Sequence, residues 1–323
     1  MLPRITVKNA GPGSLGVLID LWHRTWYAQV PPEAHHAYRM RLFTSPWARK
    51  NLQVLVLEEN GAPLSGMMAL TLSVRLDGRV LKVAGVAAVV TAPEQRGRGL
   101  AARLLAIAHR RFQDSGHHAA LLFSDIGTAY YAKLGYVPWP TTRYTLRAPA
   151  VALPRGHAVR PATPGDLPAM RALQERFQEP YALALEKSVP YWRHQLLRAR
   201  ARDEMFGIKR PAPERFVTGR FVIEAKGAPV AYARVTSRDG ALTVTEAAHL
   251  PDRAHALAAL IAARARAEAA ATIDLLAPAA LVKALGLPVA RREPCDKMML
   301  APLTLPPGSV DPVNHCFWRE DWF

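Results

Sequence analysis

An apolar run with the character of a buried strand, residues 83–92, leads into the turn Arg96-Gly97-Arg98-Gly99. A segment with the amphipathic spacing of a helix follows directly, over residues 100–112. A helix that begins at a glycine-rich turn presents unpaired backbone N–H groups and the positive end of its dipole at one point, and the two arginines add charge there. The junction therefore predicts an α/β layer whose turn binds phosphate.

The order of elements is repeated along the chain, which at 323 residues is long enough for two domains of about 150 residues each. In the first half the pattern predicts a strand over 4–7, helices over 15–28 and 33–49, strands over 53–58, 64–75 and 79–92, a helix over 100–113, a strand over 119–123, a short helix over 128–134 and closing strands over 136–146. In the second half it predicts a strand over 158–161, helices over 166–178 and 189–202, strands over 216–224, 230–237 and 241–248, a helix over 253–269, a strand over 272–276, a short helix over 279–285 and a last strand over 297–303. We therefore predict two tandem copies of one α/β fold with mixed sheets.

Composition marks the boundaries between these copies. Residues 148–156 are rich in Pro and Gly and lack periodicity, so they are interpreted as a linker between a first domain over 1–147 and a second over 157–303. The remaining residues, 304–323, contain several aromatic side chains and are expected to pack back on the body of the protein.

The second copy lacks the phosphate turn. At the corresponding place, residues 249–256 have the sequence HLPDRAHA, which contains no glycine and contains Asp252, a residue that would repel phosphate. We therefore expect the second domain to be degenerate, with the fold kept and the ligand lost.

Charge and composition make several classes of function less favoured. The net charge of +16 would attract nucleic acid, but we find no recognition helix and no basic-aromatic platform, so nucleic-acid binding is the lesser alternative. No apolar run reaches the roughly 20 residues that a bilayer requires, and the start of the chain lacks the apolar core of a signal peptide. Cys295 and Cys316 show no metal-ligand spacing. We expect a cytoplasmic protein without a metal or membrane contact, and its oligomeric state stays open.

Two motifs resemble those of a known family. Arg96, Gly99 and Ala101 fill the pattern Gln/Arg-x-x-Gly-x-Gly/Ala, which resembles motif A of the GCN5-related N-acetyltransferases. About 30 residues later, Tyr131-Ala132-Lys133-Leu134-Gly135-Tyr136 resembles motif B of the same family. Where many members have an Asn-x-x-Ala segment, this chain has Ser124-Asp125-Ile126-Gly127, so other groups must orient the pantetheine arm of the cofactor.

The resemblance implies that acetyl-CoA is the donor and that its acetyl group passes by direct attack to a primary amine of a small molecule or peptide. It implies that the donor is held by Val89, Val90 and Thr91 along the pantetheine arm and by Gln95, Arg96, Gly97, Arg98, Gly99, Leu100 and Ala101 at the pyrophosphate. Tyr131 is the implied general acid, because the ordinary pKa values of a phenol, about 10, and of a thiol, about 8.5, are close enough for proton sharing.

The general base stays open. The candidates from the sequence are a water chain and the side chains of Asp125, His117, His118, Glu33, His35 and His36. An arginine-flanked turn, a second copy without it and a C-terminal phenylalanine together resemble the enhanced-intracellular-survival aminoglycoside acetyltransferases. In those enzymes the terminal carboxylate acts as the base, which implies Phe323 here, although this sequence lacks their third domain.

Two further alternatives concern the acceptor and the reaction. Trp22, Trp26, Tyr27 and Tyr38 fall on the two helices that cover the acceptor site in this family, where they either line a pocket for an apolar or cationic amine or pack the core. The alternative to an enzyme is a module that binds a CoA ester without turnover, and the presence of Tyr131 favours the enzyme.

Overall fold

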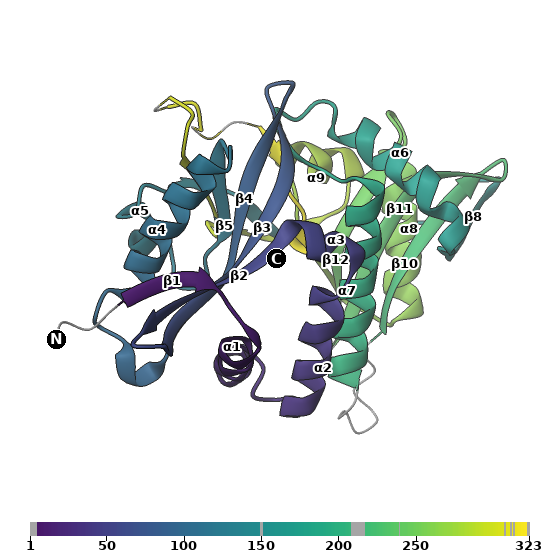
Figure 1. The fold of residues 1–323 in the computed structure, drawn as a ribbon. Coiled ribbons are helices and arrows are strands. Elements are labelled where there is room, and N and C mark those ends of the chain that lie inside the picture. Colours follow the sequence, from purple (N-terminus) through teal and green to yellow (C-terminus); the bar gives the residue numbers. More distant parts are fainter. Residues whose placement is uncertain are drawn as a thin grey trace.

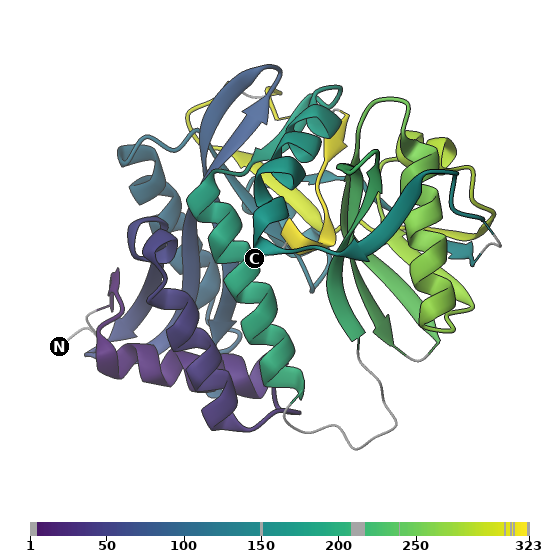
Figure 2. The same ribbon diagram turned by 90° about the vertical axis from the view of Figure 1, so that its right-hand side faces the viewer.

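The computed structural model describes residues 5–148, 151–207, 217–238, 240–306, 308–310, 312 and 314–321. In this part of the chain two mixed sheets lie side by side, each packed against helices (Figures 1 and 2). None of the described helices is long and apolar enough to cross a membrane.

The first sheet carries helices on both faces. Its strands, in spatial order, are β1 (Ile5–Asn9), β2 (Leu52–Glu59), β3 (Ala62–Leu76), β4 (Arg79–Thr91), β5 (Ala119–Phe123), β15 (Met298–Pro302) and β6 (Val137–Trp139), and two short strands, β9 (Leu183–Glu186) and β16 (His315–Cys316), extend it beyond β3. Its helices are α1 (Pro12–Trp26), α2 (Pro32–Phe43), α3 (Pro46–Asn51), α4 (Leu100–Asp114) and α5 (Ala129–Ala132). Because side chains alternate along a strand, Val56 packs in the core with α1, whereas Leu55 and Leu57 pack in the core with α4.

The second sheet repeats this plan. Its strands, in spatial order, are β14 (Val289–Pro294), β7 (Thr142–Arg147), β13 (Thr272–Leu276), β12 (Ala241–His249), β11 (Ala228–Arg238), β10 (Val217–Ala225) and β8 (His157–Pro161). Its helices are α6 (Leu167–Gln178), α8 (Ala254–Ala267) and α9 (Ala279–Leu285), with α7 (Val189–Gly207) lying against α2 of the first half (Figure 1). The predicted mixed α/β fold in two tandem copies is thus confirmed.

Each sheet contains strands from the other half of the sequence, β7 in the second sheet and β9, β15 and β16 in the first. We predicted that residues 142–146 close the first sheet and that residues 297–303 close the second, and both predictions are wrong. Strand β7 lies between β13 and β14 in the second sheet, where Leu146 pairs with Ile273 on one side and Val289 on the other. Strand β15 lies between β5 and β6 in the first sheet. A cut at residue 147 therefore separates the halves of the sequence but not the two sheets.

The predicted helix over 33–49 is two helices. Helix α2 ends at Phe43, and Ser45 then takes an extended conformation before Pro46, as residues that precede proline usually do. The Ser45 side chain accepts a hydrogen bond from the backbone N–H of Ala48 at 3.2 Å and so caps α3. This break turns α3 toward α7.

The C-terminal segment is anchored between the two halves (Figure 2). Phe317 and Trp318 are buried, and the Trp318 ring stacks on that of Phe177 at a centroid distance of 6.2 Å. Asp321 is fully buried, with an oxygen 2.5 Å from Nζ of Lys187, which also contacts Glu246 at 2.7 Å.

Candidate active site

Strand β4 separates from its neighbour where the sequence predicted cofactor contacts. Its parallel pairing with β5 ends at Val86, and its pairing with β3 contains a bulge, because Gly66 faces Val90 while Met68 faces Ala87. Ala88 in the bulge has φ +50°, a conformation that is uncommon outside glycine. The strand beyond Val86 therefore offers backbone N–H and C=O groups that β5 does not pair.

Two side-chain hydrogen bonds hold the bulge. The indole Nε1 of Trp22 donates to the carbonyl oxygen of Ala88 at 2.7 Å, and Oγ of Ser65 donates to the carbonyl oxygen of Val90 at 2.8 Å. Trp22 is thus part of the core and supports the site from behind, which is one of the two roles that the sequence left open for it.

The glycine-rich turn begins α4 as predicted. Gly97 and Gly99 have φ +80° and φ +70°, which L side chains rarely adopt, and Gly99 is the N-cap of the 15-residue helix. The guanidinium of Arg98 donates to Oε1 of Glu59 at 2.8 Å and to the side chain of Gln95. Its charge is therefore paired with the carboxylate of Glu59.

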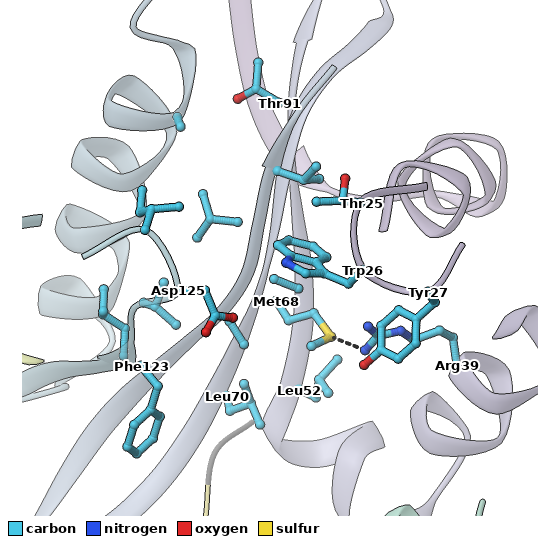
Figure 3. A pocket seen from close by; sticks show the side chains of 18 of the residues that line it. Thr25, Trp26, Tyr27, Arg39, Leu52, Met68, Leu70, Thr91, Phe123 and Asp125 are labelled. Atoms are coloured by element: carbon cyan, nitrogen blue, oxygen red, sulfur yellow. Dashed lines mark hydrogen bonds between the residues drawn. The ribbon is translucent and has the colours of Figure 1, made fainter. Parts of the chain in front are cut away.

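A cavity of about 1070 Å³ connects the turn with the open part of β4. Of the predicted donor-binding residues it is lined by Val89, Val90, Thr91, Gln95, Arg96, Gly97, Gly99, Leu100 and Ala101, whereas Arg98 does not line it. Asp125 and Phe123 form one wall of this cavity and face Trp26 and Met68 across it (Figure 3). One space thus reaches from the left-handed turn at the start of α4 to an unpaired strand edge.

Tyr131 lines the same cavity, at the start of motif B. It lies on α5, is 9% exposed, and contacts the rings of Tyr130 and Tyr136. Burial, with Tyr130 and Asp125 nearby, raises the pKa of Tyr131 to about 12. The phenol therefore keeps its proton at neutral pH, and it is a weaker acid than its ordinary pKa suggested.

The candidate bases are dispersed. Asp125 lines the cavity, but its side chain is 66% exposed and lies 2.5 Å from Nζ of Lys297. His117 is buried and contacts Thr71 away from the cavity. Phe323, the proposed source of a terminal carboxylate, lies outside the described residues.

The far end of the cavity combines both halves of the chain, which the sequence did not predict. Its lining there includes Tyr27, Tyr38 and Arg39 from the first half and His194, Arg198, Arg202 and Phe206 from α7. Burial lowers the pKa of His194 to about 4, and this side chain contacts Oγ of Ser45 at 2.9 Å. The only sequence signal for this wall was the aromatic content of the first two helices.

Comparisons with known proteins agree with this geometry. Residues 6–138 match the family model of the acetyltransferase (GNAT) domain, and no curated protein matches the chain in sequence. The chain is similar to a probable N-acyltransferase from Enterococcus faecalis V583, with 16% identity, a TM-score of 0.74, and coverage of 94% of this chain and 73% of that chain. It is similar to Eis1 from Mycobacterium abscessus, with 16% identity, a TM-score of 0.61, and coverage of 93% and 74%. It is also similar to a tandem GNAT protein from the clavulanic acid biosynthesis pathway, with 16% identity, a TM-score of 0.51, and coverage of 94% and 99%.

The fold and the site together define an acyltransferase. The match to the acetyltransferase (GNAT) domain model covers residues 6–138, and the second half repeats the fold in tandem. The exchanged strand β15 lies beyond the matched segment, although it completes the sheet of that domain.

Proposed function

We propose that this protein transfers the acetyl group of acetyl-CoA to a primary amine of a small molecule or peptide. The observation that carries the proposal is the single cavity that joins the left-handed turn of α4 to the unpaired part of β4. A pyrophosphate needs converging N–H donors, and a pantetheine arm needs a strand edge to which its amides can bind. Both requirements are met within one space.

Two parts of acetyl-CoA would bind to these two elements. The N–H groups at the start of α4 would bind the pyrophosphate, with Arg96 adding charge from the cavity lining. The pantetheine amides would pair with Val89 and Thr91 like an added strand, since β5 has already diverged. The thioester would then lie beside the bulge at Ala88.

Tyr131 would act on the departing sulfur. The amine attacks the thioester carbonyl, the C–S bond breaks, one amine proton passes to a base, and the thiolate is protonated. Full proton transfer from a phenol of pKa about 12 to a free thiolate of ordinary pKa about 8.5 would cost about 5 kcal/mol. Tyr131 therefore serves as a hydrogen-bond donor whose proton crosses only as the C–S bond breaks.

For the base, we propose the terminal carboxylate of Phe323. In support, the segment just before it is fixed by the buried Trp318 and Asp321, so the chain end starts from an ordered anchor between the two halves. Deletion of Trp322 and Phe323 should lower turnover at least 100-fold while acetyl-CoA still binds. Unchanged turnover would exclude this role.

The proposal is tested by thiol release from acetyl-CoA over a panel of primary amines, together with calorimetric titration of acetyl-CoA. Arg96→Gln, in the cavity lining, should weaken acetyl-CoA binding about 10-fold. Arg98→Gln is the matched control, because that side chain pairs with Glu59, and it should change binding less than 2-fold. Tight acetyl-CoA binding without transfer to any amine would identify a binding module in place of an enzyme.

A further inference from the structure

We propose that the acceptor amine also carries an anionic group, a carboxylate or a phosphate, and that Arg39 binds it. This inference rests on the proposed acetyl transfer and names the class of acceptor. Arg39 lies on α2, is 5% exposed and lines the acceptor end of the cavity. In Figure 3 its side chain lies beside Tyr27 and reaches toward Met68.

The contacts of Arg39 fix its position but do not neutralise its charge. Its guanidinium lies over the rings of Trp22, Tyr27 and Tyr38, at 5.2, 5.3 and 5.5 Å from their centroids. These aromatic faces orient the planar group and stabilise a cation. They supply no hydrogen-bond acceptor for its N–H groups.

The hydrogen-bond partners of Arg39 are neutral. Its Nε donates to Nε2 of His35 at 3.0 Å, and a terminal nitrogen contacts Sδ of Met68 at 3.7 Å. Burial and the nearby Arg39 lower the pKa of His35 to about 3, so His35 accepts this bond as a neutral imidazole. Among the described residues no carboxylate pairs with Arg39.

A buried cation without a counter-ion is costly unless a ligand supplies the opposite charge. The N–H donors of the planar Arg39 guanidinium have the spacing to bind both oxygens of a carboxylate or a phosphate. The position fits a substrate group, because Met68 pairs with Ala87, next to the bulge where the thioester would lie.

The other charged side chains at this end of the cavity are also positive. Arg198 and Arg202 contribute to this end of the cavity from α7, and the one carboxylate in the described lining, Asp125, lies on the opposite wall and pairs with Lys297. This distribution disfavours a polycationic acceptor, and it replaces our expectation of an apolar or cationic amine. The rings of Tyr27 and Phe206 leave room for an apolar body between the two charges.

Turnover with matched acceptors provides the first test. Phenylalanine, its amide and its phosphonate analogue share one amine and one ring and differ in the anion. We expect kcat/KM for phenylalanine or for the phosphonate to exceed that for the amide at least 30-fold. The better of the two substrates shows whether the anionic group of the acceptor is a carboxylate or a phosphate. Arg39→Met should reduce this ratio to about 1. Arg41→Met is the control on the same helix, because Arg41 pairs with Glu204 at the surface, and it should leave the ratio unchanged.

Binding of an anion without an amine provides a test that does not depend on turnover. We expect 3-phenylpropanoate or 2-phenylethylphosphonate to change the tryptophan fluorescence of the protein, since Trp22 lies under Arg39. The Kd should rise at least 10-fold in Arg39→Met and stay unchanged in Arg41→Met. If neither anion binds, or if Arg39→Met binds both equally well, the inference is overturned even where amines are acetylated. If Arg39-dependent binding occurs but no amine is acetylated, the proposed function fails and the anion site stands.

Discussion

Replacing Lys187 by methionine should destabilise the whole protein, because this side chain is the central cation of a buried cluster. Its Nζ lies 2.7 Å from Glu246 and 2.5 Å from Asp321, and the three side chains are 3%, 2% and 0% exposed. Burial alone would lower the pKa of Lys187, but the two carboxylates raise it, so the ammonium form persists. Methionine has a similar length and no charge, so the substitution removes the cation and leaves the packing.

The expected loss follows from the groups that remain. Glu246 keeps a distant contact with Arg220 at 3.6 Å, and Asp321 keeps a hydrogen bond from the backbone N–H of Trp318 at 2.8 Å. Removing one partner of a buried ion pair costs about 3–5 kcal/mol, and we expect a loss in this range at pH 8. Burial raises the pKa of Asp321, and removal of Lys187 raises it further. A carboxyl group with a raised pKa in the folded state destabilises that state as the pH increases, so the loss should shrink from pH 8 toward pH 5.

Urea titration followed by tryptophan fluorescence measures this loss. The ring of Trp192, one of the seven tryptophans, lies 5.5 Å from Nζ of Lys187, so part of the signal comes from beside the cluster. The control is the triple variant Lys187→Met, Glu246→Gln, Asp321→Asn, which removes all three charges and should recover at least about 2 kcal/mol. A loss below about 1 kcal/mol in Lys187→Met, or a loss of equal size at pH 5 and pH 8, would refute the reasoning.

Three other predictions concern the site and the core. Tyr131→Phe should lower kcat about 100-fold in the thiol-release assay and change the Kd for acetyl-CoA less than 2-fold; an equal loss in both would assign Tyr131 to binding. Gly66→Ala should lower the free energy of unfolding by about 1–3 kcal/mol, because the new Cβ would overlap with the methyl groups of Leu18. Gly13→Ala in α1 meets nothing within 4 Å and is the control, and thermal unfolding that leaves both variants alike would contradict the packing argument. His194 is kept neutral by burial, so its contribution to stability is complete above its ordinary pKa of 6.5 and is lost as the pH falls toward about 4. In urea titrations at pH 7 and pH 5, the free energy of unfolding of His194→Gln should depend on pH less steeply than that of the unsubstituted protein, by up to about 1.4 kcal/mol per pH unit. The same pH dependence in both proteins would contradict this.

The donor side of the site was predictable because its signals are local. Gly97 and Gly99 permit the left-handed turn, and the apolar run before them forms β4 with bounds close to those predicted. The direction of the Arg98 side chain was not predictable, because Glu59 lies 39 residues earlier in the chain and on another strand. Local pattern thus identified the turn but not the partner of each charge.

The acceptor side and the strand exchange depend on long-range packing. Strand β7 alternates buried Tyr144 and Leu146 with more exposed residues, a pattern that suits a place in either sheet. Helix α7 buries residues on more than one side, including Tyr191, Trp192 and Gln195, so no single apolar stripe indicated that it packs against α2. Arg39 is therefore visible in the sequence only as one arginine among many.

The exchange of β7 and β15 also sets the order in which the molecule can be completed during synthesis. Strand β6 ends at Trp139, yet the strand that joins it to β5 ends at Pro302, about 160 residues later. At about 5–20 residues per second, the facing edges of β5 and β6 remain unpaired for roughly 10–30 s while the ribosome makes the second half. Unpaired strand edges are sites of aggregation. The acetyltransferase domain, although encoded first, becomes complete only when nearly the whole chain has emerged.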